Sequence, residues 1–132
     1  MEPSRLAAIP LFATLEPGHL EALAAVAKET TAGPGQQVAT QGDFGHALYA
    51  IEEGSADVSV GGEQVRTLGP GDVFGEVAIL TAGRRTATVV ATTPMKLIAI
   101  FKRDVWSLER SSPEAGERLR RLVADRLAPQ AS

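Results

Sequence analysis

The middle of the chain alternates between apolar and polar positions with a period of two. In the run 56–60, apolar residues alternate with Asp57 and Ser59, which is typical of an antiparallel strand with one buried face. Gly61 and Gly62 follow directly and predict a two-residue hairpin. The same criteria predict strands over residues 37–40, 47–51, 56–60, 64–68, 73–74, 87–92 and 95–101, and leave open another near 28–32. Short strands at this spacing predict a mainly β fold, either a closed roll or a sandwich.

Both ends of the chain change to a helical period. Pro17 suits the first turn of a helix whose apolar stripe is best explained as core packing. After Phe101 the pattern predicts a helix over residues 102–110. Ser112 and Pro113 then read as the N-cap and first residue of a second helix. That second helix carries Leu119, Leu122, Val123 and Leu127 on one face.

Composition narrows the choice of function. A chain of 132 residues with 44% hydrophobic residues fits one domain with one core, and its net charge of −3 argues against bare nucleic acid as partner. The absence of cysteine excludes disulfides, and His19 and His46 alone are a poor basis for a metal site. No apolar run approaches the roughly 20 residues that span a membrane. The N-terminus does not resemble a signal peptide, so we expect a cytoplasmic protein.

The stretch 74–88 holds the candidate chemistry. A short strand ends at Phe74, Gly75 makes a turn, an apolar helical turn follows, and the chain re-enters β structure after Arg85. Backbone amides at the start of a helical turn attract anions, and an arginine beside them offers a planar fork of donors to phosphate. Glu76 across the loop can accept hydrogen bonds from hydroxyl groups. The combination suits a ligand that contains both a sugar and a phosphate.

This stretch closely resembles the phosphate-binding cassette of cyclic-nucleotide-binding domains. The family pattern is F-G-E-x-A-L-L, a short spacer, then R-[AST]-A-[ST]-V, and the chain has FGEVAIL from Phe74 and RTATV from Arg85. The resemblance extends over roughly residues 9–127. It implies an eight-stranded, jelly-roll-like β-roll within a single domain, 1–132. The expected parts are a helical prelude at about 9–30, the roll at about 31–101 and C-terminal helices at about 102–127.

The resemblance also implies roles for individual residues. Glu76 would hold the ribose 2′-hydroxyl and Arg85 the exocyclic phosphate oxygens. The expected ligand contacts as a set are Phe74, Gly75, Glu76, Val77, Ala78, Arg85, Thr86 and Ala87. Glu52 matches an acidic position that pairs with the phosphate-binding arginine in cyclic-AMP-dependent kinase regulatory subunits. The alternative for Glu52 is an ordinary surface charge.

The sequence says less about which purine base is bound and about how binding is signalled to a partner. Thr86 is compatible with either purine, and we favour cyclic AMP with cyclic GMP close behind. The C-terminal helices of the family move when ligand binds. We therefore expect Leu119, Leu122 or Val123 to close over the base, on a helix tied to the roll only through the segment before Pro113.

Three other classes of protein fit less well. A cupin-like metalloenzyme needs about three converging ligands, which the two histidines do not supply. A regulator with a helix-turn-helix would need chain beyond Ser132. A degenerate β-roll that binds only protein would not need the Glu76/Arg85 pair. We expect a non-catalytic sensor without metal or cofactor, with an unknown effector protein, free-standing or excised from something larger.

Overall fold

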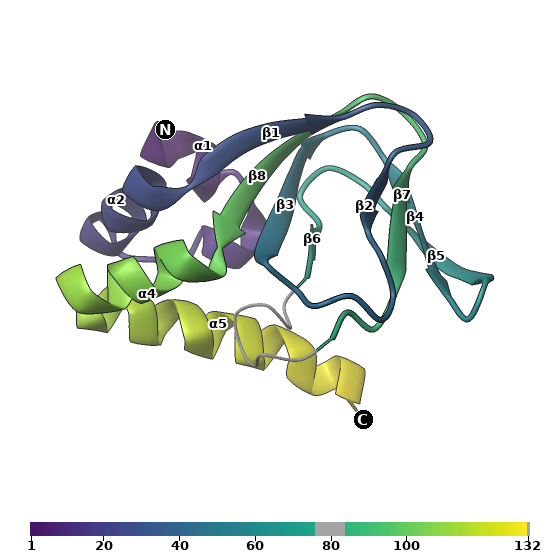
Figure 1. The fold of residues 1–132 in the computed structure, drawn as a ribbon. Coiled ribbons are helices and arrows are strands. Elements are labelled where there is room, and N and C mark those ends of the chain that lie inside the picture. The colour runs from purple at the N-terminus through teal and green to yellow at the C-terminus, as the bar shows by residue number, and fades with distance from the viewer. Residues whose placement is uncertain (76–83, 132) are drawn as a thin grey trace.

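The computed structural model describes the backbone of residues 1–75 and 84–131, and the side chains of residues 1–75 and 84–125. Three helices precede the strands, and two follow them (Figure 1). The helices are α1 (Pro3–Ala7), η1 (Pro10–Phe12), α2 (Pro17–Val26), α4 (Lys102–Ser111) and α5 (Pro113–Ala131). The strands are β1 (Lys28–Ala32), β2 (Gln37–Ala39), β3 (Ala47–Glu53), β4 (Ala56–Val60), β5 (Glu63–Leu68), β6 (Val73–Phe74), β7 (Thr88–Ala91) and β8 (Met95–Phe101). None of the described helices is long and apolar enough to cross a membrane.

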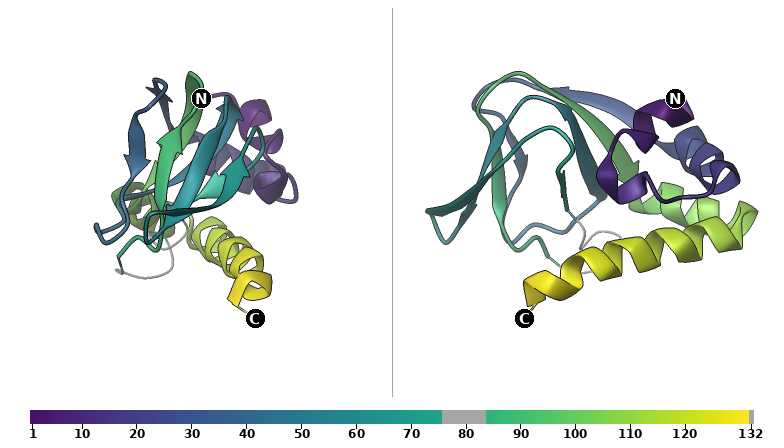
Figure 2. Two further views of the ribbon diagram at one scale, coloured as in Figure 1. Left: turned by 90° about the vertical axis from the view of Figure 1, so that its right-hand side faces the viewer. Right: turned by 180° about the vertical axis from the view of Figure 1, so that it is seen from behind.

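The eight described strands form two four-stranded antiparallel sheets, in the orders β1-β8-β3-β6 and β2-β7-β4-β5. The helices gather at one side, against the first sheet, and the β4–β5 hairpin projects from the opposite side (Figure 2). This confirms the prediction of a mainly β, antiparallel roll flanked by helices. The helical prelude differs from its predicted range because a helix already begins at Pro3 and β1 already begins at Lys28. At the other end, α5 continues to Ala131 instead of residue 127.

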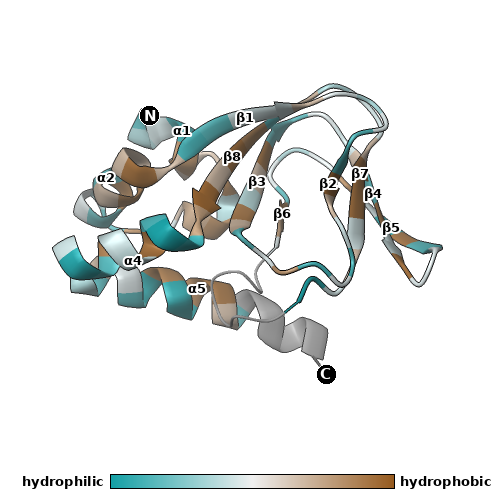
Figure 3. Cartoon of the chain, viewed as in Figure 1, coloured by the Kyte–Doolittle hydropathy of each residue, from teal (hydrophilic) through white to brown (hydrophobic). Residues whose placement is uncertain are grey.

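Strands β3 and β8 are buried on both faces. On β3, Leu48 and Ala50 face the helices, whereas Tyr49 and Ile51 face the interior of the roll. Because side chains alternate along a strand, each of these strands serves two separate apolar clusters. Figure 3 shows β8 brown over most of its length, while β1 beside it carries more polar colours.

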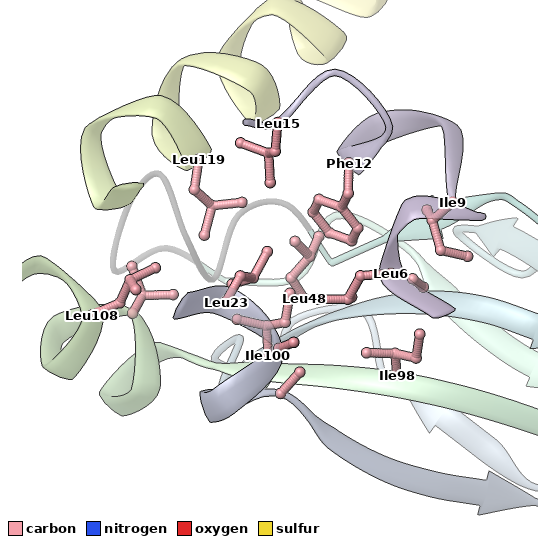
Figure 4. Packing of buried hydrophobic residues seen from close by; sticks show 14 of the residues in the cluster. Leu6, Ile9, Phe12, Leu15, Leu23, Leu48, Ile98, Ile100, Leu108 and Leu119 are labelled. Atoms are coloured by element: carbon pink, nitrogen blue, oxygen red, sulfur yellow. The ribbon is translucent and has the colours of Figure 1, made fainter. Parts of the chain in front are cut away.

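The larger cluster lies between the helices and the first sheet. Leu6, Phe12, Leu23, Leu48 and Leu119 point toward one another there, from α1, η1, α2, β3 and α5 (Figure 4). Burial of such side chains stabilises the fold by about 1.5–3 kcal/mol each. The helices are therefore part of the core rather than an attachment to the roll.

The apolar face of α5 packs against other helices in this structure, and its closure over a bound base stays a prediction. Leu119 and Val123 are 1% and 0% exposed within the helical cluster, and Leu122 packs against that cluster. An amphipathic helix buries its apolar face against the nearest apolar surface, which here is formed by α2, α4 and η1. The helix is consequently held by its own packing as well as by the segment before Pro113.

Helices α4 and α5 also share a two-bond ion pair. Arg120 donates from Nε to Glu109 Oε2 at 3.1 Å and from Nη2 to Oε1 at 2.8 Å. The hydrogen bond from Arg120 lowers the pKa of Glu109 below its ordinary value. Gly116 lets the helices approach closely, since a Cβ there would lie 3.1 Å from Glu109 Cα.

Replacing Glu109 by Gln is expected to reduce the free energy of unfolding at pH 7 by roughly 0.5–1 kcal/mol, because the pair is about a third exposed to solvent. A lowered carboxyl pKa means that this contribution is complete above the ordinary value of 4.5 and is lost as the pH falls below it. Urea unfolding of both proteins should therefore differ at neutral pH and converge under acidic conditions. A difference that persists unchanged in acid would contradict this assignment.

Candidate functional site

Arg85 is the one charged side chain that is buried among the described residues, with 9% of its surface exposed. Its Nη2 donates a hydrogen bond to the carbonyl oxygen of Ala47 at 3.1 Å. A guanidinium stays charged under all physiological conditions, so burying it is costly unless it has polar partners. The fold thus holds a permanent cation inside the roll.

Gly75 makes room for this cation. Its φ of +83° is a conformation that glycine adopts readily and other residues rarely do. A Cβ at this position would overlap Arg85 Nη1 and would lie 2.7 Å from the Ala47 carbonyl oxygen. Glycine is therefore required here for both the turn and the close approach of the arginine.

Two aromatic rings form the wall beside Arg85. Tyr49 and Phe74 are cross-strand partners on β3 and β6, and their rings stack with centroids 5.2 Å apart. The guanidinium carbon of Arg85 lies 5.7 Å from the centre of the Tyr49 ring, within the range of a cation–π interaction. The alternation that turns Tyr49 into the roll thus places it against the buried cation.

The backbone of Arg85 is fixed by the segment before β3. Its N–H donates to the Asp43 carbonyl oxygen at 2.6 Å, and its own carbonyl accepts from the N–H of Gly42 at 2.9 Å. Arg84 makes two contacts with the same segment at the surface. Its Nη1 donates to the Gly42 carbonyl, and its guanidinium lies 4.6 Å from the centre of the Phe44 ring. Arg84 itself is exposed, as expected for the first of the two arginines.

A cavity of about 80 Å³ opens beside the buried arginine. Five of the predicted ligand-contact residues line it: Phe74, Gly75, Arg85, Thr86 and Ala87. The remaining three, Glu76, Val77 and Ala78, lie outside the described residues. The lining also contains four residues that sequence reasoning missed: Ala39, Val58, Arg66 and Val89.

Arg66 reaches this cavity because of a bulge in the β4–β5 hairpin. The register shifts between Val58 and Ser59, so that Arg66 lies opposite Val58, whose side chain is buried in the roll. Val65 is left 57% exposed. A regular hairpin through Gly61 and Gly62 would instead pair Val58 with Val65, and would turn Arg66 to the outer face. In the sequence, only the alternation of apolar residues in β4 indicates which face of the hairpin is turned inward.

The structure places Glu52 away from Arg85, which corrects the expectation that Glu52 orients the phosphate-binding arginine. Both of its carboxylate oxygens bind Arg5 of α1, Oε1 at 2.6 Å from Nη2 and Oε2 at 3.0 Å from Nε. The side chains of Tyr49 and Ile51 point into the roll, and Glu52 follows on the helical side of the strand. Its carboxylate therefore anchors α1 to the sheet.

The described part of the site can bind an anion that carries an apolar group. It offers a buried guanidinium, a glycine turn with close backbone approach, the exposed hydroxyl-bearing residue Thr86, and apolar walls from both sheets. Arg66 adds a second cation, exposed at the cavity. Within the part of the chain that the structure describes, no three His, Asp or Glu side chains group as metal ligands would.

Comparison with known proteins identifies relatives along most of the chain. The family described as the cyclic nucleotide-binding domain matches residues 29–112, which is more than half of the chain. The cyclic AMP receptor protein of Thermus thermophilus is 33% identical over 123 residues, covering 89% of this chain and 57% of its own length. A cyclic nucleotide-gated potassium channel of Mesorhizobium japonicum is 35% identical over 127 residues, covering 96% of this chain and 35% of its own length. The chain thus spans less than two thirds of either relative.

A solved structure has the same fold as this chain. The N-terminal domain of a transcriptional regulator from Streptomyces coelicolor has a TM-score of 0.81 and 31% sequence identity. That similarity covers 96% of this chain and 92% of the other. Because nearly the whole of both chains is aligned, the likeness includes the helices as well as the roll.

Replacing Gly75 by Ala is expected to destabilise the protein more than replacing Gly62 by Ala. Both glycines have nearly the same φ, +83° and +84°, but nothing lies within 4 Å of a Cβ built at Gly62. Positive φ costs an alanine about 1–2 kcal/mol at each position, and overpacking against Arg85 should add about 1–3 kcal/mol at Gly75 alone. Urea unfolding of the two variants measures the difference, and equal losses would show that the contact with Arg85 is not tight.

Proposed function

Because the chain belongs to the cyclic nucleotide-binding domain family, we propose that it is a non-catalytic sensor of a 3′,5′-cyclic purine nucleotide. The observation that carries the proposal is the buried guanidinium of Arg85 beside a cavity that is also lined by Gly75 and Thr86. A cyclic phosphodiester has one negative charge and two exocyclic oxygens. A planar guanidinium in a site shielded from water can recognise those oxygens with paired hydrogen bonds.

The remaining parts of the ligand have proposed partners as well. The sugar hydroxyl is assigned to the carboxylate of Glu76, on the strength of the motif alone. The purine is assigned to the apolar lining from Val58 and Val89, whose strands β4 and β7 are neighbours in one sheet. The cavity of about 80 Å³ is smaller than the roughly 300 Å³ at which small-molecule pockets begin.

Cyclic AMP is the first candidate ligand, supported by the similarity to the cyclic AMP receptor protein. Cyclic GMP is the second candidate, and Arg66 is the observation that favours it. The N7 and O6 atoms of guanine are both acceptors and match a guanidinium fork, whereas adenine presents an amino donor in place of O6. The Thr86 hydroxyl can serve either base or phosphate.

The proposed output is regulation of an effector protein. The relatives are longer than this chain and include a receptor protein and a channel. A binding domain of this kind acts by favouring one of two conformations, and it can do so only by the difference in its affinity for them.

Arg85→Ala should weaken cyclic AMP binding about 30-fold or more, because loss of one partner from a buried charge pair costs about 2–5 kcal/mol. Isothermal titration calorimetry of the wild type, Arg85→Ala and Arg85→Lys measures the effect, with Arg85→Lys expected to lie between the other two. Arg110→Ala is the matched control, since Arg110 is exposed and does not line the cavity. Absence of any binding to the wild type, of either cyclic nucleotide, would refute the proposed function.

Arg66→Ala should weaken cyclic GMP binding about tenfold while changing cyclic AMP binding little, since one bidentate contact to guanine discriminates by about 1–3 kcal/mol.

Thr86→Ala should weaken the binding of cyclic GMP more than that of cyclic AMP, by about 1 kcal/mol, if the Thr86 hydroxyl bonds to the base. Competition between the two nucleotides for each variant gives the ratio directly. Equal losses for both nucleotides would place these side chains on the phosphate.

A further inference from the structure

A second concave surface lies at the start of α4, where the chain leaves the sheet. This groove has a volume of about 390 Å³. The residues that line it are His46, Phe101, Lys102, Arg103 and Trp106. It shares no lining residue with the cavity beside Arg85.

Two of the residues that line the groove, Phe101 and Trp106, are aromatic. Trp106 is the single tryptophan of the chain and is 54% exposed, whereas Val105 and Leu108 on the same helix are each 1% exposed. The indole thus lies on the side of α4 that is not needed for the core. Tryptophan gives a large contact area at low conformational cost, which is why it is enriched among residues that dominate binding energies.

Basic residues also line the groove. Lys102 and Arg103 contribute two positive charges, and no acidic residue is among the described residues that line it. Asp104, the nearest carboxylate in sequence, is half-buried and is not part of the lining. The whole chain has a net charge of −3, so this surface has the opposite sign to the molecule around it.

Backbone hydrogen bonds hold the groove in shape. The N–H of Lys102 donates to the His46 carbonyl oxygen at 2.9 Å, and Phe101 pairs with Ala47 in the β3–β8 ladder. The guanidinium carbon of Arg103 lies 5.5 Å from the centre of the Phe101 ring. A site fixed in this way loses little conformational entropy when a partner binds.

We propose that this groove binds an acidic peptide segment of a partner protein, with an apolar side chain of that segment resting on Trp106. The basic side chains of Lys102 and Arg103 select carboxylates, and the exposed indole and Phe101 provide the apolar contact. A groove of this size accommodates one or two side chains, so the interaction belongs to the small, transient class. The inference does not depend on nucleotide binding.

The test uses the whole chain without nucleotide and a short synthetic peptide of Glu and Asp around a central Leu-Phe pair. Occupancy should shift the emission of Trp106 to shorter wavelength, and it is the sole indole in the chain. Two control peptides, one with Lys in place of the acids and one with Ser in place of Leu-Phe, should produce no saturable change. Equal binding of the basic control would overturn the proposal.

Variants are compared by fluorescence anisotropy of the labelled peptide, since Trp106→Ala removes the intrinsic signal. Trp106→Ala should weaken binding about 30-fold, the loss typical of a dominant contact residue. Arg103→Gln should weaken it about fivefold and flatten its dependence on salt. Lys96→Gln, which removes the same charge at the far end of β8, should leave it unchanged.

Two further outcomes would also overturn the proposal. One is the absence of saturable peptide binding to the wild type. The other is Trp106-dependent adsorption to phosphatidylserine vesicles without peptide binding, which would make this a membrane-contacting surface. Because no nucleotide is present, neither result bears on the calorimetry of Arg85.

Discussion

Placing a guanidinium inside a β-roll constrains everything packed around it. Arg85 needs the Ala47 carbonyl as acceptor, a residue without a side chain at Gly75, and the ring of Tyr49 at its side. Those three positions come from β3 and from the end of β6, and they meet only when Tyr49 pairs with Phe74. A shift of one residue in that register would turn Tyr49 toward the helices. The site and the sheet register therefore depend on each other.

The same strands connect the site to the helices. Because β3 buries Leu48 and Ala50 against the helical cluster, the helices rest on the reverse side of the strand that supports the arginine. Leu119 and Val123 are fully packed in that cluster, so any output that lifts α5 must first expose them. Exposure of two such side chains costs about 3–6 kcal/mol. A ligand would have to favour the lifted state by at least that difference, and movement of the cluster as one body is the less costly route.

The strands could be predicted from sequence, and so could the grouping of Phe74, Gly75, Arg85, Thr86 and Ala87 around one cavity, because their signals are local. Alternation, paired glycines and the motif from Phe74 each involve residues that are close together in the chain. Three features depended on distant contacts and could not be read in this way. First, a bulge decides whether Arg66 or Val65 faces the cavity. Second, the partner of Glu52 is Arg5, in a helix that the sequence pattern did not predict. Third, the apolar face of α5 does not by itself specify which surface it covers. Alternation from Tyr49 and Ile51 would have indicated that Glu52 points away from Arg85.

Residues 42–47 contact both the arginine and the start of α4. Gly42 and Asp43 bond to the backbone of Arg85, and Ala47 accepts from its side chain. Between them, the His46 carbonyl accepts from the N–H of Lys102, and Ala47 opens the β3–β8 ladder opposite Phe101. A displacement of Arg85 toward a bound phosphate would therefore act on a segment that leads into the β3–β8 ladder, and most of that segment lies outside the ladder. Such a connection transmits a signal only if the segment has two stable arrangements. Within the segment, the His46 backbone holds the start of α4 while its side chain lines the basic groove.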